Sequence, residues 1–157
     1  MAAPMLNRIQ TIDRFDFEEA FPSEDPYLLI TIRKPGTHYV RVPFGSNCFE
    51  QCRLMLHENN GFRFNSRGVI VPLCDRQAAK LVNFVFDNRE SVSLLVIQSE
   101  YASQQSIAIV KCLGRWLRIP FHNEDHHIEP DPTTIATVQK AISAVPLEFD
   151  LLGDSCK

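Results

Sequence analysis

The chain has 157 residues, of which 45% are hydrophobic and 22% are charged, and its formal net charge is -3. These proportions are those of an ordinary globular protein and exclude the low-hydrophobicity, high-charge composition of disordered chains. The length is typical of one domain, so we expect a single domain over residues 1–157 with one core. A net negative chain has no overall attraction to a phosphate backbone, and we therefore expect no nucleic-acid partner.

Cysteine usage and hydropathy indicate the compartment. The five cysteines stand at positions 48, 52, 74, 112 and 156, an odd number at wide spacing, which is not typical of a disulfide framework. The N-terminus shows no charged segment followed by a continuous apolar run. We therefore expect a reducing, cytoplasmic location. The longest apolar stretch, residues 94–97, is far shorter than the roughly 20 residues that span a bilayer, so no membrane segment is expected.

Proline and glycine punctuate the first half of the chain. Tyr27–Arg33 (YLLITIR) is a β-branched, apolar run between two proline-containing turns, which predicts a buried strand. Residues 38–44 (HYVRVPF) predict a second strand, which ends or reaches a sheet edge at its internal proline. Residues 48–56 carry apolar side chains near helical spacing, so we expect a short helix there, capped by Ser46 or Asn47.

The second half predicts two helices around a strand. Residues 91–98 (SVSLLVIQ) are nearly continuously apolar, which is typical of a central parallel strand covered on both faces. Apolar side chains at helical spacing over residues 109–117 predict the helix that follows this strand. A capped helix from Asp75 is predicted before the strand, because one face would then carry Ala78, Leu81, Val82 and Val85.

A last helix is expected to begin at Thr133 or Thr134 and to run through Ala144. Strands and helices then alternate along the chain, which predicts an α/β fold with a central, mostly parallel sheet flanked by helices. The core is expected over residues 27–144, with residues 145–157 as a peripheral tail.

The loop after the strand at residues 91–98 is the first candidate for a functional site, because free N–H groups and the dipole at a helix N-terminus favour anions. The segment LVIQSEYASQQSIAIV, which contains this loop, resembles the signature of the cysteine phosphatases, the tyrosine and dual-specificity enzymes. In that signature a strand ends in His-Cys, followed by Gly three residues on and Arg three further. The corresponding residues here are Gln98, Ser99, Ala102 and Gln105, and Ser106 matches the hydroxyl residue that follows the arginine.

The resemblance extends to a bacterial branch of predicted tyrosine phosphatases, through the strand YLLITIRKPG, an RVPF-like strand and the helix RQAAKLVNFV. The Glu-Pro-Asp-Pro turn at residues 129–132 is similar to the Pro-Asn turn that opens the last helix of that branch. The similar pieces span residues 27–144 in the same order. The resemblance therefore implies a degenerate member of this superfamily.

The resemblance also implies that the reaction is lost. Cysteine phosphatases attack with a thiolate, whereas Ser99 is an alcohol that needs an adjacent base, and neighbouring glutamines are not bases. At position 105 a glutamine lacks the charged planar fork with which arginine binds phosphate oxygens. The family's general acid is an aspartate after the strand matched by residues 38–44, and residues 44–47 (FGSN) contain none.

We therefore expect a catalytically inactive phosphatase-like module, a pseudophosphatase, that binds a protein partner or a small anionic ligand and needs no cofactor. Several catalytic groups differ together, which favours a natural lineage over an engineered Cys→Ser trap. The oligomeric state stays open. The candidate ligand-binding loop consists of Gln98, Ser99, Glu100, Ala102, Gln104, Gln105 and Ser106.

Two other functions are compatible with the sequence. In a hydrolase of altered chemistry, Ser99 would work with a histidine brought from a distance, namely His38, His57, His122, His126 or His127. In a structural or assembly subunit, the contact surfaces would be Phe62, Phe64 and residues 147–152.

One polar stretch of the sequence is rich in side chains that can bind a metal ion. Its members carry ligand chemistry for a transition metal, but their spacing matches no closed zinc pattern, and a solvated loop is the better interpretation. No metal is therefore expected. The residues concerned are His122, Asp125, His126, His127 and Glu129, which Cys48 and Cys52 would join.

Overall fold

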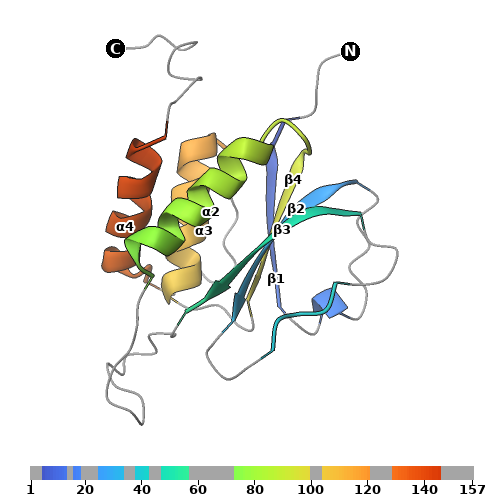
Figure 1. Cartoon of the computed structure of the whole chain (residues 1–157), viewed down its shortest axis with the longest axis horizontal. Coiled ribbons are helices and arrows are strands. Elements are labelled where there is room, and N and C mark those ends of the chain that lie inside the picture. The colour runs from blue at the N-terminus through green and yellow to red at the C-terminus, as the bar shows by residue number, and fades with distance from the viewer. Residues whose placement is uncertain are drawn as a thin grey trace.

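The computed structural model of this protein describes residues 5–13, 16–18, 25–33, 38–42, 47–56, 73–99, 104–120 and 129–145. Within these ranges the chain folds into one parallel sheet with helices packed against it (Figure 1). The expected α/β fold, with a central parallel sheet flanked by helices, is confirmed. No helix of the described ranges is both long enough and apolar enough to cross a membrane.

The sheet has the strand order β1-β4-β2-β3, and every neighbouring pair is parallel. β4 therefore lies between β1 and β2, in the interior of the sheet. Because all strands run the same way, their carboxyl ends share one edge of the sheet. In chain order the elements are β1 (Arg8–Ile12), β2 (Tyr27–Arg33), β3 (Cys48–Met55), α2 (Asp75–Asn88), β4 (Leu94–Ser99), α3 (Gln104–Leu117) and α4 (Pro132–Ser143).

The two inner strands, β2 and β4, are almost entirely buried. In β2 only the last residue, Arg33, is partly exposed, and in β4 only Ser99 is. A strand inside a parallel sheet is covered on both faces, which requires a continuous apolar run rather than an alternating one. The central strand expected at residues 91–98 is therefore confirmed, with bounds shifted to Leu94–Ser99.

Helices cover one face of the sheet. α2 and α3 lie next to the strands, and α4 packs against both of them as the outermost helix in Figure 1. The core between this layer and the sheet includes Leu28, Ile30, Leu95 and Ile97 from the strands. On α2 the apolar face is buried as expected, through Ala78, Leu81, Val82 and Val85.

A second, smaller core lies on the opposite face of the sheet. Phe17 and Tyr27 are fully buried there, and their rings meet edge to face with centroids 6.5 Å apart. Val40 joins the same cluster from residues 38–42. In the described part of the chain this face is therefore covered by the short helical segment 16–18 and by irregular backbone, and the three long helices all lie on the other face.

Two of the expected elements are wrong. Residues 38–42 form no strand, although Val40 is buried against the sheet. Residues 48–55 form the strand β3 rather than a helix, so Asn47 precedes a strand and caps no helix. The Asn47 carbonyl accepts a hydrogen bond from the Tyr27 N–H (3.1 Å). The alternation along β3 gives the physical reason. Cys52, Leu54 and Leu56 are buried, whereas Gln51, Arg53 and Met55 are exposed.

The strand β1 was not predicted from the sequence. It pairs with β4 along its whole length, from Arg8 beside Leu94 to Ile12 beside Gln98. Only two β1 residues, Ile9 and Ile12, are aliphatic, and both are partly buried. As an edge strand, β1 needs fewer apolar residues than an inner strand, because it has a strand on one side only.

Candidate functional site

The junction between β4 and α3 lies at the carboxyl edge of the sheet, where parallel α/β domains bind ligands. β4 ends at Ser99 and α3 begins at Gln104. Glu100 and Ala102, two members of the candidate loop, lie outside the described residues. The described members are Gln98 and Ser99 on the strand and Gln104, Gln105 and Ser106 in the first turn of the helix.

Gln98 points to the face of the sheet that carries the smaller core. Alternation places it on the same side as Val96, and in the sheet it lies between Ile12 of β1 and Thr31 of β2. Its side chain is 2% exposed and Thr31 is 1% exposed. Among the described residues, neither Gln98 Nε2 nor Thr31 Oγ1 has a hydrogen-bond partner. Two neighbouring inner strands therefore hold unpaired polar atoms on the same face.

Ser99 and Gln105 lie on the helical side of the sheet. Ser99 alternates with Gln98, so it shares the side of Ile97, which packs in the larger core. Gln105 is 2% exposed and precedes Ile109 by one helical turn, so it lies on the buried side of α3, and its Oε1 has no hydrogen-bond partner. The structure therefore brings Gln105 to the side of Ser99 and leaves Gln98 on the opposite side of β4.

Polar contacts hold the starts of α3 and α4 together. The Asp131 N–H donates to the Gln104 carbonyl (2.9 Å). The Asp131 carboxylate caps α4 by accepting hydrogen bonds from the Thr134 N–H (2.9 Å) and the Thr134 hydroxyl (2.6 Å). The expected start at Thr133 or Thr134 is therefore moved back, because Asp131 is the cap and Pro132 the first helical residue.

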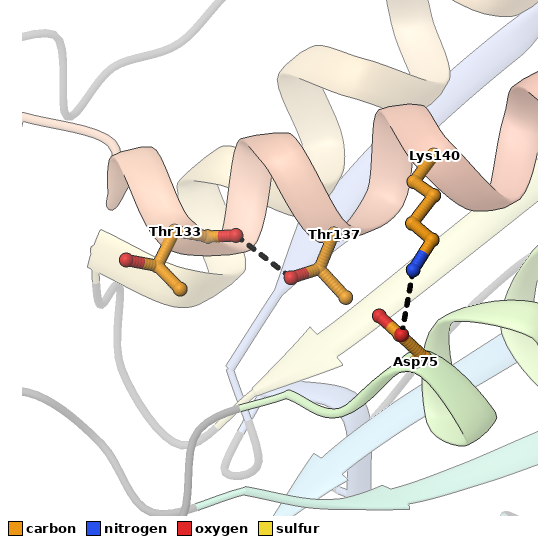
Figure 2. A network of polar contacts seen from close by, with 4 residues as sticks. All are labelled: Asp75, Thr133, Thr137 and Lys140. Atoms are coloured by element: carbon orange, nitrogen blue, oxygen red, sulfur yellow. Dashed lines mark hydrogen bonds and ion pairs between the residues drawn. The ribbon is translucent and has the colours of Figure 1, made fainter.

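α4 is also tied to α2 (Figure 2). Lys140 forms an ion pair with Asp75, the first residue of α2, at 2.9 Å. Within α4, the Thr137 hydroxyl donates to the Thr133 carbonyl (2.8 Å). The Lys140–Asp75 pair is exposed and contributes little stability, but with the Asp131 contacts it connects α4 to both inner helices.

The chain leaves β1 and β4 toward opposite faces of the sheet. After β1 it places Phe17 on the smaller core, whereas after β4 it enters α3 on the larger core. In open α/β sheets, ligands bind outside the carboxyl ends of adjacent parallel strands whose connections diverge in this way. Register places Asp13 beside Ser99 at this point. The Asp13 carboxylate already accepts a hydrogen bond from the Asp16 N–H (2.8 Å).

Sequence reasoning missed a cluster of two arginines on one tyrosine at the same edge. The guanidinium carbons of Arg33, at the end of β2, and Arg53, on β3, lie 4.3 Å and 4.9 Å from the centroid of the Tyr39 ring. The alternation of buried and exposed residues around Arg53 could have predicted this cluster. The alternation identifies β3 as a strand and places Arg53 on the same face of the sheet as Arg33.

The described residues of the junction itself are electrically neutral. Gln98, Ser99, Gln104, Gln105 and Ser106 carry no charge. The α3 N-terminus contributes its free N–H groups and the positive end of its dipole, and its first turn contains no acidic residue. These five residues can therefore hold an anionic group through N–H and hydroxyl donors, but they supply neither a base nor a cation for catalysis. The carboxylate beside them, that of Asp13, already accepts a hydrogen bond from the Asp16 N–H.

The structure bears on the expected absence of a general acid only through the strand before it. That expectation placed the acid loop after a strand at residues 38–44, and the structure has no strand at residues 38–42. The strand that follows β2 is β3, and the sequence after β3 includes His57 and Glu58. Residues 57–60 lie outside the described residues. The expected absence of a general acid therefore stays a prediction.

Three of the four described cysteines, Cys48, Cys52 and Cys112, are buried or half-buried and are poor candidates for a nucleophile. Burial raises the pKa of Cys48 to about 11, with a smaller contribution from Glu50. Burial also raises the pKa of Cys52 and of Cys112. A raised pKa keeps a thiol protonated near neutral pH, and the protonated form is a poor nucleophile.

The raised pKa of Cys48 predicts a slow reaction of its thiol with alkylating reagents. At about pH 8 we expect iodoacetamide to alkylate the exposed Cys74 first and Cys48 far more slowly, because a thiol of pKa about 11 is about one-thousandth ionised at that pH. The Cys48 rate should rise about tenfold per pH unit up to pH 11. Peptide mass spectrometry measures each rate. Equal labelling of Cys48 and Cys74 at about pH 8 contradicts the raised pKa of Cys48.

The other sequence-based sites lie mostly outside the described residues. This holds for His57, Phe62, Phe64, His122, Asp125, His126, His127 and residues 147–152. Cys48 and Cys52 lie on opposite faces of β3, one in each core, and not together on a helix face. In the ranges that the structure describes, no group of three His, Cys, Asp or Glu side chains is placed to hold a metal ion.

Comparison of the chain with protein-family models, with curated proteins and with solved structures finds no match.

Proposed function

We propose that this protein is a catalytically inactive, phosphatase-like binding module that holds an anionic group at the β4–α3 junction. The observation that carries the proposal is the pair formed by half-buried Ser99 and buried Gln105 at the carboxyl end of an inner strand. These are the positions at which the resemblance expects a nucleophilic cysteine and a phosphate-binding arginine. An alcohol and a neutral amide stand there instead.

Binding is supported by the donors at the junction. The first N–H groups of α3 have no carbonyl partner within the helix, and a helix of 14 residues places a partial positive charge at this end. Ser99 and Ser106 add hydroxyl groups on the strand end and in the first helical turn. Hydrogen-bond donors without a cationic side chain suit a small oxyanion held loosely, on a small molecule or on a protein partner.

Inactivity is supported by the chemistry of the two replacements. A serine alcohol is not ionised near neutral pH without an adjacent base, and a glutamine cannot be that base. Hydrogen bonds from a charged donor are roughly twice as strong as neutral ones, so the change from arginine to Gln105 also weakens the grip on phosphate. We therefore expect a dissociation constant on the order of 1 mM, which corresponds to a binding free energy of roughly -4 kcal/mol.

The test is a titration of the isotope-labelled protein with inorganic phosphate and phenyl phosphate, followed by amide NMR. We expect saturable shifts at Ser99, Gln104, Gln105 and Ser106, because their N–H groups lie at the proposed site. Sodium chloride at equal ionic strength is the control for general salt effects, and it should leave these amides unchanged.

A matched pair of substitutions locates the binding site. Ser99→Asp puts a negative charge at the junction and is expected to abolish the shifts through repulsion of the anion. Ser91→Asp makes the same change at an exposed position before the amino end of β4, and it should leave the response intact. The proposal is wrong if the junction amides do not respond to either phosphate, or if Ser99→Asp binds as well as Ser91→Asp.

A further inference from the structure

A cavity of about 510 Å³ lies between α3 and α4, away from the β4–α3 junction. Its volume falls within the roughly 300 to 1,000 Å³ of small-molecule sites. Its first residue on α3, Lys111, comes six residues after Gln105, which is about 9 Å further along the helix axis. The cavity is therefore a separate site, and ligand binding there is independent of the proposed function of the β4–α3 junction.

The floor of this cavity is apolar. Cys112 and Trp116 are one turn apart on α3, and Ile135 and Ile142 lie two turns apart on the facing side of α4. Trp116 is 9% exposed and stacks on Phe86 with ring centroids 6.4 Å apart, which fixes the plane of its ring. Burial raises the pKa of the Cys112 thiol, so this side chain is neutral near pH 7 and adds to the apolar floor.

The rim of the cavity is cationic on one side. Lys111 and Arg115 are exposed and one turn apart on α3, so both side chains rise from the edge of the same floor. Among the described residues, none that lines the cavity is acidic, and neither cation has an ion-pair partner. Gln139 of α4 lies on the rim and offers a neutral amide.

We propose that this cavity binds a small amphipathic anion, such as a medium-chain or aromatic carboxylate. Its apolar body lies on Trp116, Ile135 and Ile142, and its charged group contacts Lys111 and Arg115. An apolar floor with a few polar groups at one side is the usual composition of a ligand site, and the two unpaired cations give the charge preference. A neutral ligand of the same shape loses the cationic contacts, and a cationic ligand is repelled.

The protein contains its own probe for this site, because its single tryptophan is Trp116 on the cavity floor. We would titrate the protein with octanoate, octanol and octylamine below their aggregation concentrations and record tryptophan fluorescence. The three probes share the apolar body and differ in charge. We expect a saturable change with octanoate at a concentration at least about tenfold lower than with octanol, which is about the effect of one charge-assisted contact. Octylamine should bind most weakly.

Two variants assign the effect to the cavity. Lys111→Gln combined with Arg115→Gln is expected to remove the preference for octanoate and to keep octanol binding, because the floor is unchanged. Arg76→Gln, which neutralises an exposed arginine of α2 outside the cavity lining, is the matched control and should behave as the parent. Ile142→Phe fills the floor and is expected to abolish the response to all three probes.

Circular dichroism establishes that each variant is folded before it is titrated. The proposal is overturned if octanoate produces no saturable change, or if the three probes bind equally. It is also overturned if the double glutamine variant keeps the preference for octanoate, or if a folded Ile142→Phe protein responds as the parent does.

Discussion

Replacing Gln98 by leucine is expected to raise the free energy of unfolding by about 1 to 3 kcal/mol. The side chain is 2% exposed and its Nε2 has no hydrogen-bond partner. An unpaired buried donor keeps the full cost of its lost hydration, whereas an apolar side chain of similar size has no such cost. Urea unfolding of the parent and the variant measures the difference, provided that the two denaturation slopes agree.

Gln77 provides the matched control, because it is a glutamine with both ends of its amide paired. Its Oε1 accepts a hydrogen bond from the Cys74 N–H (3.1 Å), and its Nε2 donates to the Met55 carbonyl (3.0 Å). Gln77→Leu should therefore lower stability by about 1 kcal/mol. If Gln98→Leu also destabilises the protein, the Gln98 amide is paired in solution and the account of this position is incorrect.

The free energy of unfolding is expected to rise in Gln98→Leu and to fall in Gln77→Leu, and this difference bears on function. Proteins keep polar groups that reduce stability mainly where an activity requires them. Gln98 lies beside Thr31 on the smaller core, on the other side of β4 from Ser99. Because Gln98 and Ser99 point to opposite faces of the sheet, we expect the Gln98→Leu protein to retain the phosphate response of the Ser99 amide. Any activity that keeps Gln98 polar would lie on the face of the smaller core.

The second large effect is expected from changing Ser99 to cysteine and Gln105 to arginine together. A thiol at the end of β4 faces the N-terminus of α3, which lowers a cysteine pKa, unlike the burial that raises the pKa of Cys48 to about 11. Arginine adds the charged fork that stabilises the transferring phosphoryl group. Together they should raise aryl phosphate hydrolysis by at least about a hundredfold, the typical effect of one transition-state contact.

Gln105 is buried, so an arginine at this position has to reach the loop to remain hydrated. Circular dichroism of the double variant therefore belongs to the experiment. Ser99→Cys alone serves as a second arm that avoids this risk, because its alkylation rate against pH reports the thiol pKa without requiring turnover. A Ser99→Cys thiol that ionises below about pH 8 would place the α3 N–H groups around position 99.

The inner elements of the fold could be predicted because their sequence pattern has one structural interpretation. The buried run of β2 and the apolar face of α2 are unambiguous, since the first lacks polar interruptions and the second repeats at helical spacing. The edge strands were missed for different reasons. β1 is held by its pairing with β4, which no local pattern encodes. β3 has apolar residues that fit both the spacing of a helix face and the alternation of a strand.

The ambiguity of β3 can be located at particular residues. Cys48, Cys52 and Met55 are four and three residues apart, as on a helix face. Cys52, Leu54 and Leu56 alternate, as on a strand, and these are the residues that the structure buries. Exposed Met55 supplied the false helical signal. The pairing of β3 with β2 decides between the two patterns, because β2 needs a neighbour on that side.

The position of the candidate site along the chain could be predicted, but the directions in which its side chains point could not. The apolar patterns predict a strand over residues 91–98 and a helix with apolar spacing over residues 109–117, and the structure extends these to Ser99 and back to Gln104. Which face each glutamine takes depends on strand register and on the helical phase, and the sequence does not specify them across residues 100–103. The burial of Gln98 and Gln105 on opposite sides of β4 therefore required the structure.

The most direct test of the central claim is hydrolysis of p-nitrophenyl phosphate by the parent, by Ser99→Ala and by the folded Ser99→Cys, Gln105→Arg protein. The account predicts that the parent is no more active than Ser99→Ala, and that the double variant acquires turnover. Turnover by the parent that Ser99→Ala removes would contradict the account, because Ser99 would then be a working nucleophile.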